Sequence, residues 1–168
     1  MDHSAGLLMY RWRPAYSTQV LLVHPGGPYW QHRDKGWWSI PKGKVEDGEE
    51  ILGAAMREFE EELGFTPSVV APKFLGTHQQ SKTKKVSVFA FEGEWEVSRL
   101  KSNTCEIEYP AGSGKMLTIP EIDRASWFKL KEEAYDYILP GQRKFLYELA
   151  ALIYWEPWHV HYEEEVSQ

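Results

Sequence analysis

The sequence predicts an α/β domain. Along the chain, strands precede and follow a central helix, and a second helix comes after the last strand. Helical spacing of apolar residues indicates the central helix at 50–63 and the second helix at 142–154. Short apolar or alternating runs, separated by Gly, Pro and polar residues, indicate the strands. A length of 168 residues suits one core, so we expect residues 1–168 to form a single domain.

Two strands and a shorter third are expected before the central helix. Residues 4–12 alternate weakly and residues 19–24 form a short apolar run, with a loop at 13–17 between them. The Pro-Gly-Gly-Pro run at 25–28 then interrupts regular structure. Residues 37–43 form a brief strand that ends in a Pro-Lys-Gly turn. This part of the sequence therefore predicts a strand pair followed by an irregular connection.

The central helix is predicted from helix propensity and from signals at its ends. Residues 50–63 are mostly good helix formers, and Gly64 provides a C-terminal stop because glycine readily adopts the left-handed conformation. Asp47, with Glu50 three residues later, predicts a cap at the N-terminus. The apolar stripe that would pack on a sheet contains Leu52, Ala55, Met56, Phe59 and Leu63.

Strand character returns after the helix. Residues 69–80 and 84–91 form two strands, the second with clean alternation. Residues 94–115 are polar and rich in Gly and Pro, which predicts a long loop acting as a functional insertion or lid. Residues 117–119 and 126–130 again have strand character.

The C-terminal part is predicted to be helical. Residues 132–138 suit one or two helical turns, and the apolar spacing within 142–154 predicts a helix that covers the second face of the sheet. The polar tail at 156–168 is expected to fray.

Composition restricts the possible classes of function. The net charge of −6 argues against charge-driven binding of nucleic acid, which needs a basic surface. No apolar run approaches the ~20 residues of a membrane span, so no membrane partner is expected. Cys105 is the single cysteine and has no catalytic context, which fits a reducing compartment. We expect a cytoplasmic protein.

The central helix carries more carboxylates than a solvated helix needs. Glu58, Glu61 and Glu62 project from neighbouring positions, where like charges repel by about 0.2–0.5 kcal/mol per pair. Glu60 points about 160° away from Glu58 and is expected to be exposed surface. A hard cation such as Mg²⁺, which prefers oxygen ligands, would offset the repulsion. The alternative from these residues alone is an ordinary solvated acidic face.

The spacing around these carboxylates resembles a known motif. Gly43, five residues, Glu49, seven residues and then the run 57–65, Arg-Glu-Phe-Glu-Glu-Glu-Leu-Gly-Phe, resembles the Nudix box. Phe59 and Phe65 occupy positions that are usually aliphatic in that family, a change that affects packing rather than chemistry. Every fixed polar or glycine position of the box is present, so the resemblance is specific.

The resemblance implies a fold and an activity. The fold would be an α/β/α sandwich with a mixed β-sheet, the box helix on one face and the terminal helix on the other. The reaction would be hydrolysis of a pyrophosphate bond in a nucleoside diphosphate derivative, such as a nucleoside triphosphate or dinucleoside polyphosphate. Metal-activated water would be the nucleophile, with Mg²⁺ or alternatively Mn²⁺ as cofactor and a small nucleotide as the binding partner.

The resemblance also implies roles for the box residues. Metal ligands would be the side chains of Glu58, Glu61 and Glu62 and a backbone carbonyl from Lys42 or Gly43. Arg57, placed with the catalytic residues Glu58 and Glu121, would act in a supporting role through Glu49 or a neighbouring carboxylate.

Outside the box, Glu121 is the candidate for a further metal ligand or proton acceptor, since it lies six residues before Trp127, as in many members of the family. Glu58 is the other candidate for the proton acceptor, and Glu106 and Glu108 are rivals to Glu121 in the preceding loop. Substrate phosphates are expected to bind Lys42, whose Pro-Lys-Gly turn resembles that of dinucleoside polyphosphate hydrolases, and Lys82 and Lys84 of a basic hairpin tip. An ordinary charged surface is the alternative for these lysines.

The choice of substrate stays open at this point. The stretch 24–38 resembles a bacterial subgroup of predicted pyrophosphohydrolases. A base-specific pocket would instead indicate an enzyme that removes oxidised nucleoside triphosphates, and the box does not encode one. A different class of function is a Nudix domain that binds a nucleotide as a sensor without turning it over.

Overall fold

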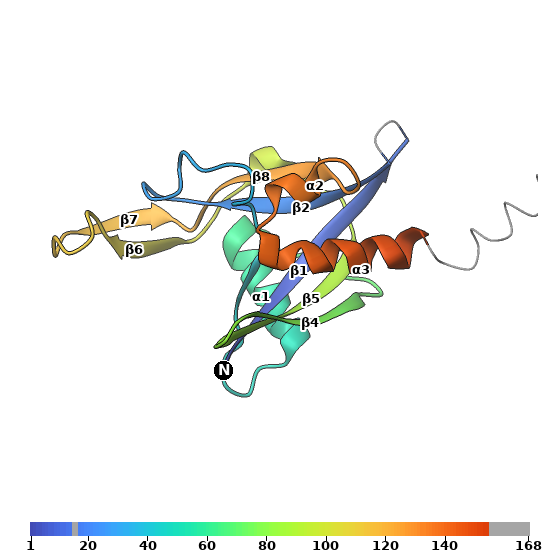
Figure 1. The fold of residues 1–168 in the computed structure, drawn as a ribbon, viewed down its shortest axis with the longest axis horizontal. Coiled ribbons are helices and arrows are strands. Elements are labelled where there is room, and N and C mark those ends of the chain that lie inside the picture. Colours follow the sequence, from blue (N-terminus) through green and yellow to red (C-terminus); the bar gives the residue numbers. More distant parts are fainter. Residues whose placement is uncertain (15–16, 155–168) are drawn as a thin grey trace, which may run out of the picture.

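The computed structural model describes residues 1–14 and 17–154 and contains one large mixed sheet with a helix on each face (Figure 1). In chain order the strands are β1 (Asp2–Arg13), β2 (Ser17–Pro25), β3 (Lys42–Lys44), β4 (Lys73–Ser81), β5 (Lys84–Glu92), β6 (Thr104–Glu108), β7 (Met116–Pro120) and β8 (Ile122–Lys129). The helices are α1 (Ile51–Leu63), α2 (Ala134–Tyr137) and α3 (Arg143–Tyr154), and 3₁₀ turns lie at Val97–Arg99 and Pro140–Gln142.

The large sheet has the strand order β4-β5-β1-β2-β8, with β3 paired to β1. The β1–β5 pair is parallel and the other pairs are antiparallel, so the sheet is mixed as predicted. Alternation along β1 directs Leu7 and Met9 toward α1 and Leu8 toward α3. Each face thereby acquires its own apolar core, and the predicted sandwich is confirmed.

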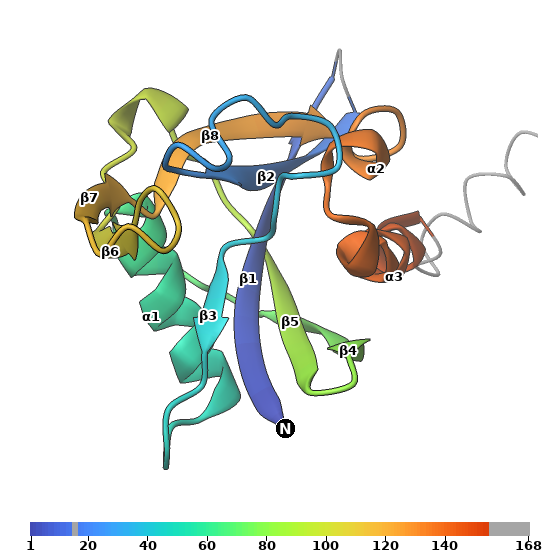
Figure 2. The same cartoon turned by 60° about the vertical axis from the view of Figure 1, so that its left-hand side comes forward.

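β2 and β3 pair with the same edge of β1 at different heights (Figure 2). β2 pairs with the end of β1 at Tyr10–Arg13, and β3 pairs with its start at Ser4–Gly6. Where the two separate, the N–H of Leu7 donates to the carbonyl of Pro41 (3.1 Å). The predicted strand at 37–43 is therefore wrong in extent, because only its end continues into β3, and Trp38 and Ser39 form isolated bridges.

The ends of α1 confirm one prediction and correct another. Gly64 has φ 86°, and its N–H donates to the carbonyl of Glu60, so the predicted glycine stop is present. The predicted cap is wrong: no side chain caps the N-terminus, and Glu49 instead accepts the N–H of Glu46 (3.0 Å). The apolar stripe is confirmed at Ala55, Phe59 and Leu63, all fully buried, whereas Ala54 rather than Leu52 joins the core.

The predicted long loop at 94–115 is wrong in part, because the segment contains a 3₁₀ turn at Val97–Arg99 and the strand β6. β6 pairs with β7 as a separate two-stranded sheet that projects from the body (Figure 1). The sequence T-C-E-I-E of β6 alternates, with Cys105 and Ile107 half-buried and Glu106 and Glu108 exposed. The apolar side of this hairpin thus faces the protein, which places it beside the site described below.

No helix within residues 1–14 and 17–154 is long and apolar enough to cross a membrane. The predicted fraying tail at 156–168 and the centre of the predicted loop at 13–17 lie outside the described residues. α3 begins at Arg143, one residue after the predicted helix start, and packs Phe145, Leu146 and Leu149 onto the sheet.

Candidate active site

Arg57 on α1 joins the loop before the helix to the end of β3. Its Nε and Nη2 donate to the two carboxylate oxygens of Glu49 (2.7 and 3.0 Å), and Nη2 also donates to the carbonyl of Lys44 (2.9 Å). This two-point pairing lowers the pKa of Glu49 to about 2 and raises the pKa of Arg57. The supporting role expected for Arg57 and Glu49 therefore has a geometric basis, because together they fix β3 against α1.

The third guanidinium nitrogen of Arg57 contacts two predicted metal ligands. Nη1 donates to Oε1 of Glu58 (2.9 Å) and to Oε1 of Glu61 (3.2 Å). Glu60, by contrast, is exposed on the other side of α1, as its helical position predicts. Arg57 thus orients two neighbouring carboxylates and partly offsets their mutual repulsion.

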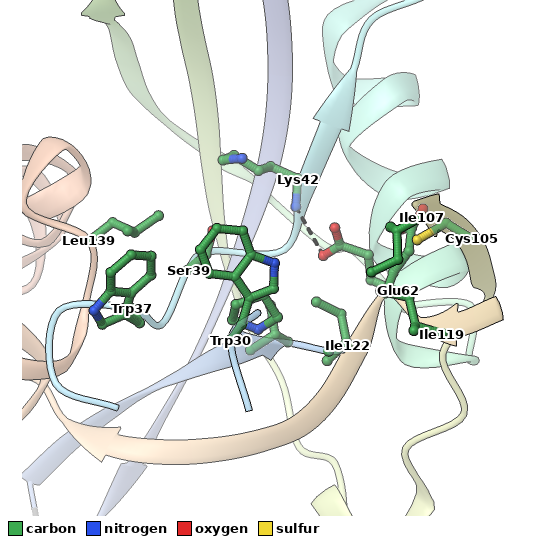
Figure 3. Close-up of a pocket in the computed structure, with 14 residues that line it drawn as sticks. Trp30, Trp37, Ser39, Lys42, Glu62, Cys105, Ile107, Ile119, Ile122 and Leu139 are labelled. Carbon is green, nitrogen blue, oxygen red and sulfur yellow. Dashed lines mark hydrogen bonds between the residues drawn. The ribbon is translucent and has the colours of Figure 1, made fainter. Parts of the chain in front are cut away.

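Gly43 allows β3 to approach α1 closely. A Cβ atom built on Gly43 would overlap the carboxyl group of Glu58, so any other residue would displace that side chain. One helical turn after Glu58, the carboxylate of Glu62 accepts the backbone N–H of Lys42 (3.2 Å; Figure 3). The absence of a side chain at Gly43 therefore permits both carboxylates to lie against the strand.

Strand register distinguishes the two candidate backbone carbonyls. The N–H of Val45 donates to the carbonyl of His3 and that of Leu7 to the carbonyl of Pro41, so β3 turns its odd-numbered backbone groups toward β1. Gly43 belongs to that set. The carbonyl of Lys42 points the other way, toward α1, in agreement with the bond from its N–H to Glu62.

Burial and mutual charge alter the acidity of the carboxylates. Burial raises the pKa of Glu58, and the nearby charge of Glu61 raises it further against the opposing effect of Arg57. Burial raises the pKa of Glu62 strongly, with Lys42 acting in the opposite direction. Such a group of buried carboxylates is electrostatically costly as it stands, and a cation with oxygen preference would relieve that cost.

Glu121 lies where three segments of the chain meet. Its N–H donates to the carbonyl of Asn103 (3.0 Å), and its own carbonyl accepts the N–H of Gly26 (2.9 Å). With its amide nitrogen facing the two acceptors, Asn103 donates to Oε2 of Glu121 (3.1 Å) and to the carbonyl of Glu61 (3.2 Å). Burial, followed by the charge of Glu61, raises the pKa of Glu121. A residue far from the box in sequence is thereby fixed beside α1.

The remaining candidates separate into two groups. Lys84 at the start of β5 shares a cavity with Lys42, Glu58 and Glu121, whereas Lys82 is exposed at the hairpin tip and does not line that cavity. Burial, with Lys84 nearby, lowers the pKa of Lys42.

The two rivals of Glu121 lie on the outer side of β6. Glu106 and Glu108 are exposed there, and Oε1 of Glu108 accepts the N–H of Gly114 (2.7 Å). The geometry therefore favours Lys42, Lys84 and Glu121 over Lys82, Glu106 and Glu108.

The donor set suits a hard metal ion but is not closed around one. Among the described residues, no three His, Cys, Asp or Glu side chains converge closely enough to hold an ion without rearrangement. The reason is visible in the contacts, since Arg57 engages Glu58 and Glu61 while the Lys42 N–H engages Glu62. The oxygens of these carboxylates and of the Lys42 carbonyl are nevertheless the type of ligand that Mg²⁺ prefers.

Two adjoining cavities open at the separation of β2 and β3. The charged cavity, of about 440 Å³, is lined by Glu58, Glu62 and Glu121 and by Lys42 and Lys84, whereas Glu61 does not line it. The aromatic cavity, of about 470 Å³, is lined mainly by apolar groups, including Trp30, Trp37, Ile107, Ile119 and Leu139 (Figure 3). Lys42, Glu62 and Glu121 line both cavities. A mainly charged cavity thus adjoins a mainly apolar one.

Several of these residues were missed by the sequence analysis. Asn103 carries no motif, and only the structure shows that it links α1 to Glu121. Ile107 and Cys105 could have been found from the polar–apolar alternation of residues 104–108, which predicts a strand with one buried side. Trp30 and Trp37 belong to an aromatic-rich segment, but nothing in their spacing places them near the box.

Comparison with known proteins agrees with the fold. A family model described as "NUDIX domain" matches residues 4–149 of this chain. A mixed sheet with a carboxylate-bearing helix after a glycine turn is the class of structure expected for that family. The chain therefore belongs to the NUDIX family.

Curated relatives share part of the chain. It is 28% identical over 115 residues to Nudix hydrolase 5 of Arabidopsis thaliana. The aligned region covers 68% of this chain and 33% of the relative. It is 30% identical over 117 residues to the RNA pyrophosphohydrolase of Francisella tularensis subsp. mediasiatica (strain FSC147), with 64% and 72% covered. The chain thus spans about a third of the length of the plant relative and most of the bacterial one.

Solved structures share the fold. A Caenorhabditis elegans Ap4A hydrolase in a binary complex aligns with a TM-score of 0.58 and 23% identity, covering 89% of this chain and 97% of that one. The NUDIX domain of Shewanella oneidensis NrtR, complexed with ADP ribose, aligns with a TM-score of 0.61 and 11% identity, covering 90% and 87%. At these identities the similarity supports the fold alone.

Proposed function

We propose that this protein is a Mg²⁺-dependent hydrolase that cleaves a phosphoric anhydride bond in a nucleoside diphosphate derivative. The observation that carries the proposal is the convergence of Glu58, Glu62 and Glu121 with Lys42 and Lys84 around one cavity that opens into an aromatic one. Anionic phosphates fit the first cavity when a cation is present, and a nucleoside fits the second.

Glu58, Glu61, Glu62 and the carbonyl of Lys42 are the groups that would hold the ion. When bound, a divalent ion lowers the pKa of water and offsets charge on phosphate oxygens. Its charge would also compete with Arg57 for Glu58 and Glu61, which are held at 2.9 and 3.2 Å from Nη1. The Mn²⁺ ion suits the same oxygen donors and is the second cofactor to test.

The side chains of this chain supply the remaining chemistry. Lys42 and Lys84 offer positive charge to the phosphates, which favours binding of a polyanion in an otherwise acidic cavity. Glu121 is fixed by Asn103 and has a raised pKa, which suits it to accept the proton of the attacking water, with Glu58 as the other candidate. The names of the relatives, an RNA pyrophosphohydrolase and an Ap4A hydrolase, fit cleavage of such bonds.

The second candidate function is nucleotide binding without turnover. The observation that favours it is the engagement of Glu58 and Glu61 by Arg57, which leaves no closed ligand set among the described residues. The solved NUDIX domain complexed with ADP ribose is consistent with ligand binding as such a domain's role.

Formation of nucleoside mono-, di- or triphosphate products is measured across nucleoside triphosphates, dinucleoside polyphosphates and nucleotide sugars, with and without Mg²⁺ or Mn²⁺, and this tests the proposal. We expect metal-dependent turnover of at least one class, and equal turnover by the Glu60→Gln variant, which alters an exposed carboxylate of the same helix. Metal-dependent binding with no turnover of any compound would instead support the sensor.

A further inference from the structure

We propose that the aromatic cavity binds the planar base of the substrate by stacking on Trp30, and that it does so without selecting among bases by their hydrogen-bonding edges. This inference rests on the proposed function, because it assigns the part of the nucleotide that lies beyond the phosphates. The chemical class of the ligand is therefore a phosphorylated compound with a flat aromatic group.

The tryptophan pair provides one wall of the cavity. The ring centroids of Trp30 and Trp37 lie 5.3 Å apart with planes tilted by 32°. A base inserted between two rings needs about 7 Å, twice the ~3.5 Å contact distance of carbon atoms, so the pair is already closed to insertion. The guanidinium of Arg33 also lies over Trp37, with Cζ 5.3 Å from the ring centroid. Trp30, which is 38% exposed, is left as the stacking surface.

The opposite wall comes from the hairpin. Ile107 of β6 and Ile119 of β7 line the cavity, and Figure 3 shows them on the side away from Trp37. Because β6 and β7 are antiparallel and place Ile107 opposite Leu117, the inward side chains of both strands form one apolar surface. A flat ring would thus meet an indole on one side and branched aliphatic groups on the other.

The two walls are fixed to one another without any ligand. The hydroxyl of Tyr29, next to Trp30, donates to the carbonyl of Glu108 on β6 (2.8 Å). Farther along the same loop, the carbonyl of Arg33 accepts a hydrogen bond from Nε2 of His24 (2.6 Å), a fully buried side chain of β2. Preformed walls reduce the entropy that binding would cost, so the cavity is organised to receive a ligand.

The cavity has few polar side chains with which to distinguish bases. Of the 14 lining residues, Lys42, Glu62 and Glu121 belong also to the charged cavity. Ser39 already donates to the carbonyl of Ile40 (2.9 Å) and accepts from Nε2 of Gln142 (3.1 Å). Stacking tolerates any base, because every base has a π-face. Strong selection needs buried groups that an incorrect ligand leaves unpaired.

The first experiment compares a ligand with a base and a ligand without one. Binding of methylene-bridged adenosine triphosphate and of inorganic tripolyphosphate is measured with Mg²⁺ for the wild-type protein and for Trp30→Ala. We expect Trp30→Ala to weaken nucleotide binding by about 5- to 150-fold and to change tripolyphosphate binding by less than about twofold. Equal weakening of both ligands, or no weakening of the nucleotide, would overturn the inference.

Two matched variants guard this comparison. Trp30→Phe keeps an aromatic face and should restore most of the nucleotide affinity that Trp30→Ala loses. If the indole had only a structural role, its replacement would change the binding of the nucleotide and of tripolyphosphate alike. Trp12→Ala removes a 62% exposed tryptophan of β1 that lines neither cavity, and should leave both affinities unchanged. If Trp12→Ala weakened nucleotide binding as much as Trp30→Ala does, the assignment of Trp30 as the stacking surface would be wrong.

The binding readout separates this inference from the proposed hydrolysis. Trp30-dependent binding with no turnover would support the cavity and contradict the enzyme, whereas turnover that is independent of Trp30 would do the reverse. A second panel compares triphosphates of adenosine, guanosine and inosine, which differ at the base edges. We expect the three affinities to lie within about tenfold of one another. A pocket that hydrogen-bonds the base edges can prefer one ligand by ~10⁴-fold, and a preference approaching that size would overturn the inference that the cavity does not select among bases.

Discussion

The charged cavity and the aromatic cavity adjoin each other, but they are built in different ways. The charged one comes mainly from α1 and the strand β3 that Gly43 allows against it, and it buries Glu58 and Glu62 at an electrostatic cost. The aromatic one comes from the loop after β2, the β6–β7 hairpin and Leu139, and it buries mainly apolar surface. The first thus concentrates charge at a cost to folding, and the second concentrates apolar surface, whose burial favours folding.

This difference teaches what each kind of substitution should change. Removing a carboxylate from the charged cavity should reduce turnover while relieving repulsion in the folded protein. Changing a wall of the aromatic cavity should alter affinity for part of the ligand and leave the chemical step intact. The following variants test that separation.

The largest effect is expected for Glu62→Gln. The change keeps the size of the side chain and removes a buried charge next to the N–H of Lys42, so kcat should fall by about 10²–10³-fold, corresponding to several kcal/mol of lost stabilisation. Thermal unfolding without metal should show an equal or higher Tm. Steady-state kinetics at saturating Mg²⁺ provide the measurement, with exposed Glu60→Gln as control. Equal damage by the two variants would contradict the helical geometry of the site.

A smaller loss is expected for Glu121→Gln, of about 10²-fold in kcat, since general-base catalysis typically contributes 10²–10⁴-fold. The effect should be mainly on kcat rather than KM, because the group acts in the transition state. Glu108→Gln, on the outer side of β6, is the matched control. If Glu121→Gln kept wild-type kcat, Glu58 would become the candidate proton acceptor.

Tyr29→Phe tests the aromatic side and should have a modest effect. It removes the hydrogen bond to the carbonyl of Glu108 that joins the two walls, so KM for a nucleotide should rise by about two- to fivefold with kcat unchanged. The KM for tripolyphosphate, if that compound is cleaved, should not move. A fall in kcat with no change in KM would show that the two cavities are not separable.

The smallest effect is expected for Glu49→Gln, a change in stability that depends on pH. The pKa of Glu49 is lowered to about 2 by Arg57, so its stabilising contribution is present above the unfolded pKa near 4.5 and is lost as pH falls toward 2. The Tm should be lower than wild type by about 1–3 °C at pH 7. Differential scanning calorimetry from pH 7 to pH 3 should show this difference shrink, and a difference that grows on acidification would contradict the pairing.

How far the sequence predicts the structure depends on how local the contacts are. The grouping of Glu58, Glu61 and Glu62 was predictable because all three lie on one helix, whose geometry follows from spacing alone. The two layers of apolar residues on β5 were predictable for the same reason, since alternation assigns Val86 and Val88 to one face and Phe91 to the other.

What could not be predicted depends on contacts between distant segments. Asn103 meets Glu121 only because the chain leaving α1 returns alongside it, and Tyr29 meets Glu108 across 79 positions. The 94–115 segment was mistaken for a loop because its polar outer side chains and Gly-Pro tip hide a short alternating strand. Local sequence patterns do not specify which face of a hairpin will pack against the rest of the protein.

The shared position of Lys42, Glu62 and Glu121 has a consequence for redesign. The hairpin reaches the charged cavity only through Glu121, which follows β7 directly, so its inward side chains at Ile107 and Ile119 can be replaced without altering α1. Exchanging those two side chains for larger or polar ones would change which nucleotides the protein accepts while leaving the same bond exposed to attack. If the proposed function holds, ligand preference could then be changed through the hairpin separately from the groups on α1, with Glu121 as the residue of the hairpin side that belongs to both cavities.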